Sequence, residues 1–146
     1  MKFLIKFASI FLLGFSSYSQ NSLNSEELTI NWLTLHTQND IELQVRKSPC
    51  DLEGVPKEFT YGFIKIINST SEDIEIQFSI ELDYTDGCTG CDSPNEDVRT
   101  VLVKANSSID TDCSVNNNLL SFLINNPYQL DHKNLVKVRL VGFKTL

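Results

Sequence analysis

The chain has 146 residues, of which 41% are hydrophobic and 21% are charged, and its formal net charge is −7. A chain of this size suits one domain that can bury a core of its own. The acidic balance, with no basic cluster to offset it, excludes nucleic acid and anionic lipid surfaces as expected partners.

Residues 1–19 have the pattern of a secretory signal peptide. Lys2 and Lys6 precede an apolar run from Phe7 to Phe15, which is too short to span a bilayer. Small residues at positions 17 and 19 predict cleavage after Ser19, and the polar flank that follows disfavours an uncleaved anchor. Cleavage would change the net charge to −9, because it removes two lysines and no acid. We therefore expect an exported protein, periplasmic or extracellular, with no membrane span.

Residues 20–27 are predicted to be a loose leader, and residues 28–146 a single domain. In that domain apolar and polar residues alternate, which is typical of strands with one buried face. Strands are predicted at 28–35, 41–45, 58–68, 74–84, 97–104, 108–112 and 136–140. A phase shift at Gly62 indicates a bulge or a central strand. Residues 116–129 fit either a helical turn or a strand.

About seven short strands, separated by turn-forming residues, predict an all-β fold. The expected architecture is a single antiparallel β-sandwich, immunoglobulin-like in general plan, with a small barrel or jelly roll as the alternative. Trp32 is predicted to lie in the core.

The four cysteines, Cys50, Cys88, Cys91 and Cys113, are the chain's most reactive side chains. If each short turn reverses the chain direction, all four lie at one end of the sandwich. Two structural disulfides are expected, because an exported chain with an even cysteine count folds in an oxidising compartment. A four-cysteine zinc site and a redox-active CxxC are the alternatives.

The acidic residues around "CTGC" disfavour a redox role, since negative charge disfavours a thiolate. Loop-closure entropy does not decide between the possible pairings. The closeness of the two sulfurs in CxxC favours Cys88–Cys91 together with Cys50–Cys113.

Other polar residues are better explained without a site. The acids Asp83, Asp86, Asp92 and Asp97 could hold Ca²⁺, but their spacing does not match an EF-hand and fits a solvated loop. His36 and His132 lie in no hydrolase or metalloprotease motif. Asn68 and Asn106 match the glycosylation pattern, but both fall in predicted turns. No nucleophile, base and orienting group occur together.

The order of several motifs resembles a family of small exported flavobacterial proteins of unknown function. The motifs are "LQVRKSPC", "GFIKIINST", "ELDYTDGCTGCDSP" and "ANSSIDTDC", and the signal peptide ending "FSSYSQ" is similar to those common in Bacteroidetes. The resemblance covers most of residues 40–113. It implies a secreted or periplasmic β protein and brings no ligand or catalytic residue with it.

We therefore expect a non-catalytic binding module of the envelope or extracellular space, without cofactor, whose partner is a protein or a glycan. Loops gathered at one end of a rigid scaffold are a common recognition surface. A cysteine-based metal-binding protein and a thiol–disulfide oxidoreductase are the alternatives. The sequence does not fix the oligomeric state.

Overall fold

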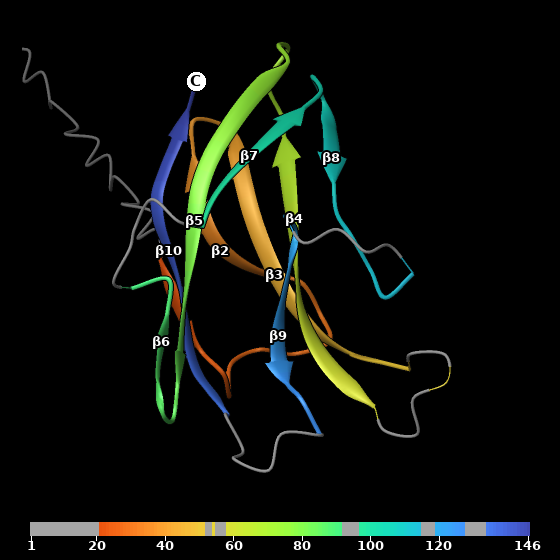
Figure 1. The fold of residues 1–146 in the computed structure, drawn as a ribbon. Coiled ribbons are helices and arrows are strands. Elements are labelled where there is room, and N and C mark those ends of the chain that lie inside the picture. The colour runs from red at the N-terminus through yellow and green to blue at the C-terminus, as the bar shows by residue number, and fades with distance from the viewer. Residues whose placement is uncertain (1–20, 52–53, 55–57, 92–96, 115–118, 128–133) are drawn as a thin grey trace, which may run out of the picture.

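A computed structural model describes residues 21–51, 54, 58–91, 97–114, 119–127 and 134–146. These residues form ten β-strands and two five-stranded antiparallel sheets (Figure 1). The all-β prediction is thus confirmed, the described residues form ten strands where about seven were predicted, and the immunoglobulin-like plan stays a prediction. The described ranges hold no helix that is long and apolar enough to cross a membrane. The predicted signal peptide lies outside the described residues.

The first sheet is built around one long strand, β5. Its strands are β1 (Ser22–Asn24), β10 (Leu135–Thr145), β5 (Ile74–Tyr84), β6 (Gly87–Thr89) and β7 (Val98–Val103). The order is β1-β10-β5, and β6 and β7 share the remaining edge of β5. The short strand β6 therefore forms a tight hairpin with the end of β5.

The second sheet is built around β4, the aromatic-rich strand. Its strands are β2 (Leu33–Gln38), β3 (Ile41–Cys50), β4 (Phe59–Asn68), β8 (Ser107–Ile109) and β9 (Ser121–Asn125). The order is β2-β3-β4, and β8 and β9 share the other edge of β4. Residues 116–129 thus contribute a strand, β9, within their described part. β4 is central, and its pairing with β3 runs past Gly62 without a register shift.

The two sheets share one hydrophobic core. Period-two alternation directs Phe78 and Ile80 of β5 and Ile64 and Ile66 of β4 inward, and each is at most 1% exposed. One cluster of buried residues joins these side chains across both sheets. The opposite face of each sheet carries the polar and aromatic side chains that form the candidate sites.

Two sequence predictions need correction. The supposed loose leader contains β1, which pairs with β10 because Leu23 is buried in the shared core. Trp32 is half-buried and lies outside the core cluster. It comes directly before β2, where the chain places its ring against Arg46 and Lys65 on the outer face of the second sheet.

Candidate functional site

The four cysteines form two separate disulfides. Cys50 pairs with Cys113, and Cys88 pairs with Cys91, with Cα–Cα distances of 5.5 and 5.8 Å. This is the pairing that the closeness of the CxxC sulfurs favoured. Cys88 belongs to the first sheet and Cys50 to the second, so the four sulfurs do not gather in one site.

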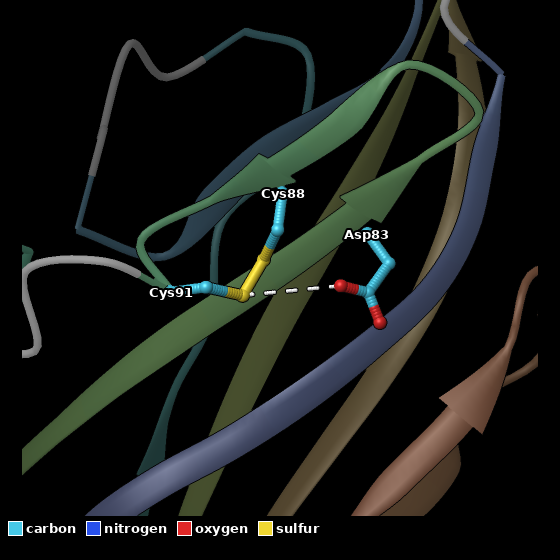
Figure 2. A group of neighbouring side chains, drawn as sticks. All are labelled: Asp83, Cys88 and Cys91. Carbon is cyan, nitrogen blue, oxygen red and sulfur yellow. Dashed lines mark hydrogen bonds between the residues drawn. A yellow bond between two sulfur atoms is a disulfide. The ribbon is translucent and has the colours of Figure 1, made fainter.

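The β5–β6 hairpin and a glycine bring Cys91 back over the first sheet. Cys88 is the cross-strand neighbour of Asp83 in the hairpin. Gly90 then adopts a φ of +85°, and a Cβ on it would lie 3.1 Å from the carbonyl oxygen of Ile80. Both features favour glycine, which accepts positive φ and a close approach of backbone. The turn sets the Cys91 sulfur beside Asp83 (Figure 2).

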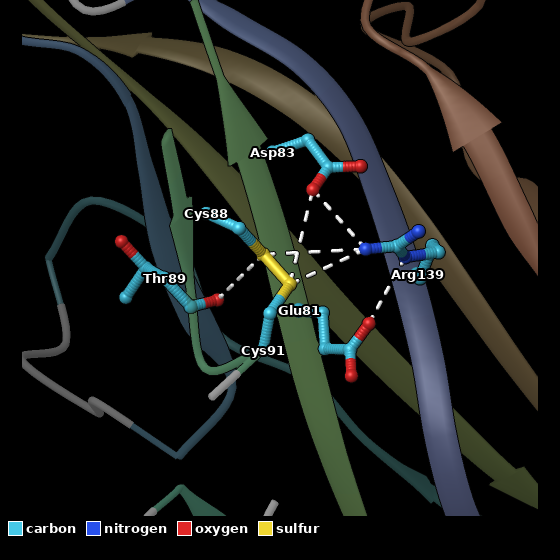
Figure 3. The surroundings of a disulfide bond; sticks show 6 residues. All are labelled: Glu81, Asp83, Cys88, Thr89, Cys91 and Arg139. Atoms are coloured by element: carbon cyan, nitrogen blue, oxygen red, sulfur yellow. Dashed lines mark hydrogen bonds and ion pairs between the residues drawn. A yellow bond between two sulfur atoms is a disulfide. The ribbon is translucent and has the colours of Figure 1, made fainter. Parts of the chain in front are cut away.

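Arg139 reaches both sulfurs from the neighbouring strand β10. Its Nη2 atom lies 3.3 Å from Cys91 Sγ and 4.0 Å from Cys88 Sγ (Figure 3). The same atom donates a hydrogen bond to Asp83 Oδ1 at 3.1 Å, and Nε forms an ion pair with Glu81 Oε2 at 3.0 Å. Two carboxylates therefore hold the guanidinium in place against the disulfide.

Register explains why these groups meet. Glu81 and Asp83 are two residues apart on β5 and so project from the same, outer face of the sheet. Arg139 is the cross-strand partner of Glu81 on one side, and Cys88 is that of Asp83 on the other. Arg139 was not predicted from the sequence, because it lies 48 residues beyond Cys91. The alternation in residues 136–140 predicted a strand. Knowing that this strand pairs with β5 would have placed Arg139 beside Glu81.

A metal site at this hairpin would require reduction of the Cys88–Cys91 disulfide. One ligand atom each from Asp83, Cys88 and Cys91 lies within 4.8 Å of the others. The two sulfurs are bonded to each other, and neither is a thiolate, the form that binds metal. Among the described residues, Cys50 and Cys113 are not part of this group, so the four sulfurs of the alternative zinc site are not brought together.

The second disulfide lies in different surroundings. Cys50 is 1% exposed yet outside the core cluster, so it is buried on the outer side of the second sheet. The sulfurs of Cys50 and Cys113 lie near backbone carbonyls, those of Ser48 at 3.9 Å and Pro49 at 3.4 Å. This bridge holds the segment after β8 against the end of β3.

The outer face of the second sheet carries a row of aromatic rings with two cations. We call this the aromatic face; it consists of Trp32, Arg46, Phe59, Tyr61, Phe63 and Lys65. The Phe59, Tyr61 and Phe63 rings follow one another along β4 at centroid distances of 6.3 and 6.2 Å. Register places Arg46 beside Phe63, and its guanidinium carbon lies 4.7 Å from the Trp32 ring and 5.8 Å from the Phe63 ring.

The aromatic face is only partly covered. Phe63 is 2% exposed, whereas Trp32, Phe59 and Tyr61 are half-buried. Ring faces that remain accessible beside stacked cations form a flat, amphipathic surface. In the sequence, residues 58–68 are aromatic-rich and apolar on both faces, so their odd positions were not recognised as an outward row.

The remaining predicted residues have structural explanations. Asn68 is 1% exposed, and its amide donates to the carbonyls of Glu72, Val103 and Lys104, so it joins two strand ends and is no accessible glycan acceptor in the fold. His36 contacts the Asn21 side chain and the Phe143 ring. Asp83 is bound to Arg139 and Asp97 to Arg99, while Asp92 and His132 lie outside the described residues.

No protein-family model, curated protein or solved structure matches the chain. Fold and site therefore define its class: a two-sheet, all-β protein with two disulfides and an aromatic outer face.

Proposed function

We propose that the protein is an exported, disulfide-stabilised, non-catalytic module on a β-sandwich scaffold, and that it binds a polysaccharide through the aromatic face. The observation that supports this most is the accessible, half-buried rings of Phe59 and Tyr61, which follow one another along β4 beside the Trp32–Arg46 stack. The signal-like segment 1–19 and the two disulfides support export. A surface of ring faces and stacked cations of this kind suits binding along an extended ligand.

The chemistry of the face favours a sugar chain over an apolar partner. The C–H face of a sugar ring stacks on an aromatic ring, while its hydroxyl groups need hydrogen-bond partners at the rim. Gln44 and Ser48 of β3 share the outer side with Arg46 and supply such groups. A row along one strand accommodates successive units of a chain-like ligand. A cysteine-based metal protein ranks lower, because Cys88 and Cys91 are bonded to each other.

Trp32 provides a direct test, since it is the only tryptophan in the chain. We expect its fluorescence to change in a saturable way when a soluble neutral β-glucan or an anionic polyuronate is added to the intact protein. Replacing Tyr61 by Ala should weaken that binding by roughly tenfold, because one stacking surface is lost.

The matched control is Leu102→Ala, which removes an exposed apolar side chain from β7 of the other sheet and should leave the affinity unchanged. Circular dichroism shows whether each variant is folded. The proposal is wrong if neither polysaccharide alters the emission of Trp32, or if Leu102→Ala weakens binding as much as Tyr61→Ala does.

A further inference from the structure

A cation lies at contact distance from the Cys88–Cys91 disulfide. Arg139 Nη2 lies 3.3 Å from Cys91 Sγ, and the guanidinium is held there by Glu81 and Asp83. Both cysteines of the hairpin are half-buried, whereas the other disulfide joins Cys50, which is 1% exposed, to Cys113, which is exposed. The feature that sets the hairpin sulfurs apart is therefore the neighbouring guanidinium, which places them well to accept negative charge.

We propose that the Cys88–Cys91 hairpin is a thiol–disulfide exchange site, in which Cys88 is the sulfur attacked by an external dithiol and Cys91 is the leaving sulfur. The assignment rests on the unequal contacts of Arg139: its Nη2 atom lies 3.3 Å from Cys91 Sγ and 4.0 Å from Cys88 Sγ. A departing thiolate is stabilised by a neighbouring cation, so the bond breaks more readily toward Cys91.

The exchange is a two-electron reaction with a dithiol. A thiolate of the dithiol bonds to Cys88 Sγ, the Cys88–Cys91 bond breaks, and its electron pair goes to Cys91 Sγ. The second thiolate of the dithiol then attacks its partner sulfur in the mixed disulfide and releases Cys88 as a thiolate. The dithiol ends as a disulfide, the protein ends with two thiols or thiolates, and the protons come from the dithiol.

The charged groups around the hairpin determine which of the two sulfurs leaves as the thiolate. Among the described residues, the other charged groups near the hairpin, beside Arg139, are Glu81 and Asp83 of β5, Asp86 of the hairpin turn and Lys137 of β10. The acids oppose negative charge on either sulfur, and Asp83 Oδ1 lies 3.8 Å from Cys91 Sγ. The Arg139 N–H is nearer to Cys91 and can donate to it, as a carboxylate cannot. Arg139 thus distinguishes the two sulfurs.

The first experiment maps reduction of the intact, oxidised protein. Dithiothreitol is added in steps at pH 7, free thiols are alkylated, and mass spectrometry locates the label. We expect Cys88 and Cys91 to be labelled at lower dithiothreitol concentration than Cys50 and Cys113. In excess glutathione with acid quenching, the mixed disulfide should form on Cys88. Simultaneous labelling of all four cysteines, or an adduct mainly on Cys91, overturns the proposal.

The second experiment tests the part played by Arg139. Arg139→Met should slow the reduction of the hairpin by about threefold to tenfold and shift the alkylation of Cys91 to higher pH. Arg139→Lys keeps the charge and should recover part of the rate, which a purely structural role would not explain. Lys144→Met removes an exposed charge from the same strand and serves as the control, with a rate close to that of the unaltered protein. An unchanged rate in Arg139→Met contradicts the inference.

Discussion

Gly62 shows how the absence of a side chain at one position allows a large side chain of the neighbouring strand to pack there. A Cβ at this position would overlap the ring of Phe122, which belongs to the neighbouring strand β9. Phe122 is 5% exposed and part of the core, so its ring has little room to withdraw. The absence of a side chain at Gly62 therefore makes the space that Phe122 occupies.

Gly62→Ala is expected to destabilise the protein by about 1–3 kcal/mol, because the methyl group overpacks a filled site. Urea unfolding followed by circular dichroism measures the change. Adding Phe122→Leu to Gly62→Ala should cost less than the two single changes together, since the smaller side chain leaves room for the methyl group. A Gly62→Ala variant as stable as the unaltered chain would falsify this explanation.

The sequence predicts a residue's role when that role depends on the pattern of its own strand. It does not predict the role when that depends on contacts with a strand elsewhere in the chain. The phase change at Gly62 was visible, but its partner Phe122 lies in a segment whose strand character was ambiguous. Trp32 was assigned to the core on its size alone, whereas cation–π contacts with Arg46 and Lys65 hold it outside. Arg139 acts at a hairpin built by a different part of the chain.

At the scale of elements, Tyr84 connects the two sheets. It ends β5 of the first sheet, and its hydroxyl donates a 2.6 Å hydrogen bond to the carbonyl oxygen of Leu123 in β9 of the second. Burial raises the pKa of Tyr84 above its ordinary value of 10.0. The folded protein thus holds this proton more tightly than the unfolded chain does.

Tyr84→Phe should lower stability by about 1 kcal/mol near neutral pH, because the Leu123 carbonyl loses its donor. In the unaltered protein this contribution is present below about pH 10 and is lost as the pH rises through the raised pKa of Tyr84. The stability difference between the two proteins should therefore shrink at alkaline pH. Denaturant titrations at pH 7 and above pH 10 measure it, and a difference that does not change with pH contradicts this account.

Long strands were easier to predict than short ones. The predicted strand at 74–84 coincides with β5 (Ile74–Tyr84), because six apolar residues alternate without a break. β1 and β6 were missed, since three residues are too few to show a period. Both depend on pairing with a longer strand, β10 or β5, and the local sequence does not predict such pairing.

At the scale of the whole molecule, neither disulfide joins the two sheets. Cys50–Cys113 connects the end of β3, in the second sheet, to the segment that follows β8, and Cys88–Cys91 closes the hairpin of the first sheet. Immunoglobulin domains of antibodies instead place an inter-sheet disulfide against a buried tryptophan. Here the shared core, with Tyr84 at its margin, holds the sheets together.

The two disulfides should differ in their contribution to stability. Cys50–Cys113 spans 63 positions and Cys88–Cys91 spans three, so the chain-entropy relation assigns about 4 kcal/mol to the first and about 2 kcal/mol to the second. We expect Cys50→Ala with Cys113→Ala to lower the free energy of unfolding more than Cys88→Ala with Cys91→Ala. Urea unfolding without reductant, at one pH, compares the two pairs.

The result also separates a structural bridge from an exchange site. A bridge that mainly restrains the unfolded chain costs stability when removed, whereas the hairpin can open with its flanking pairings intact, because β5 stays paired with β10 and β7. The first sheet should therefore keep its circular dichroism signal when Cys88 and Cys91 are replaced. If both double variants lose the same free energy of unfolding, or if only the Cys88→Ala, Cys91→Ala variant unfolds, the Cys88–Cys91 disulfide is required for the fold. Such a result would contradict its role as an exchange site.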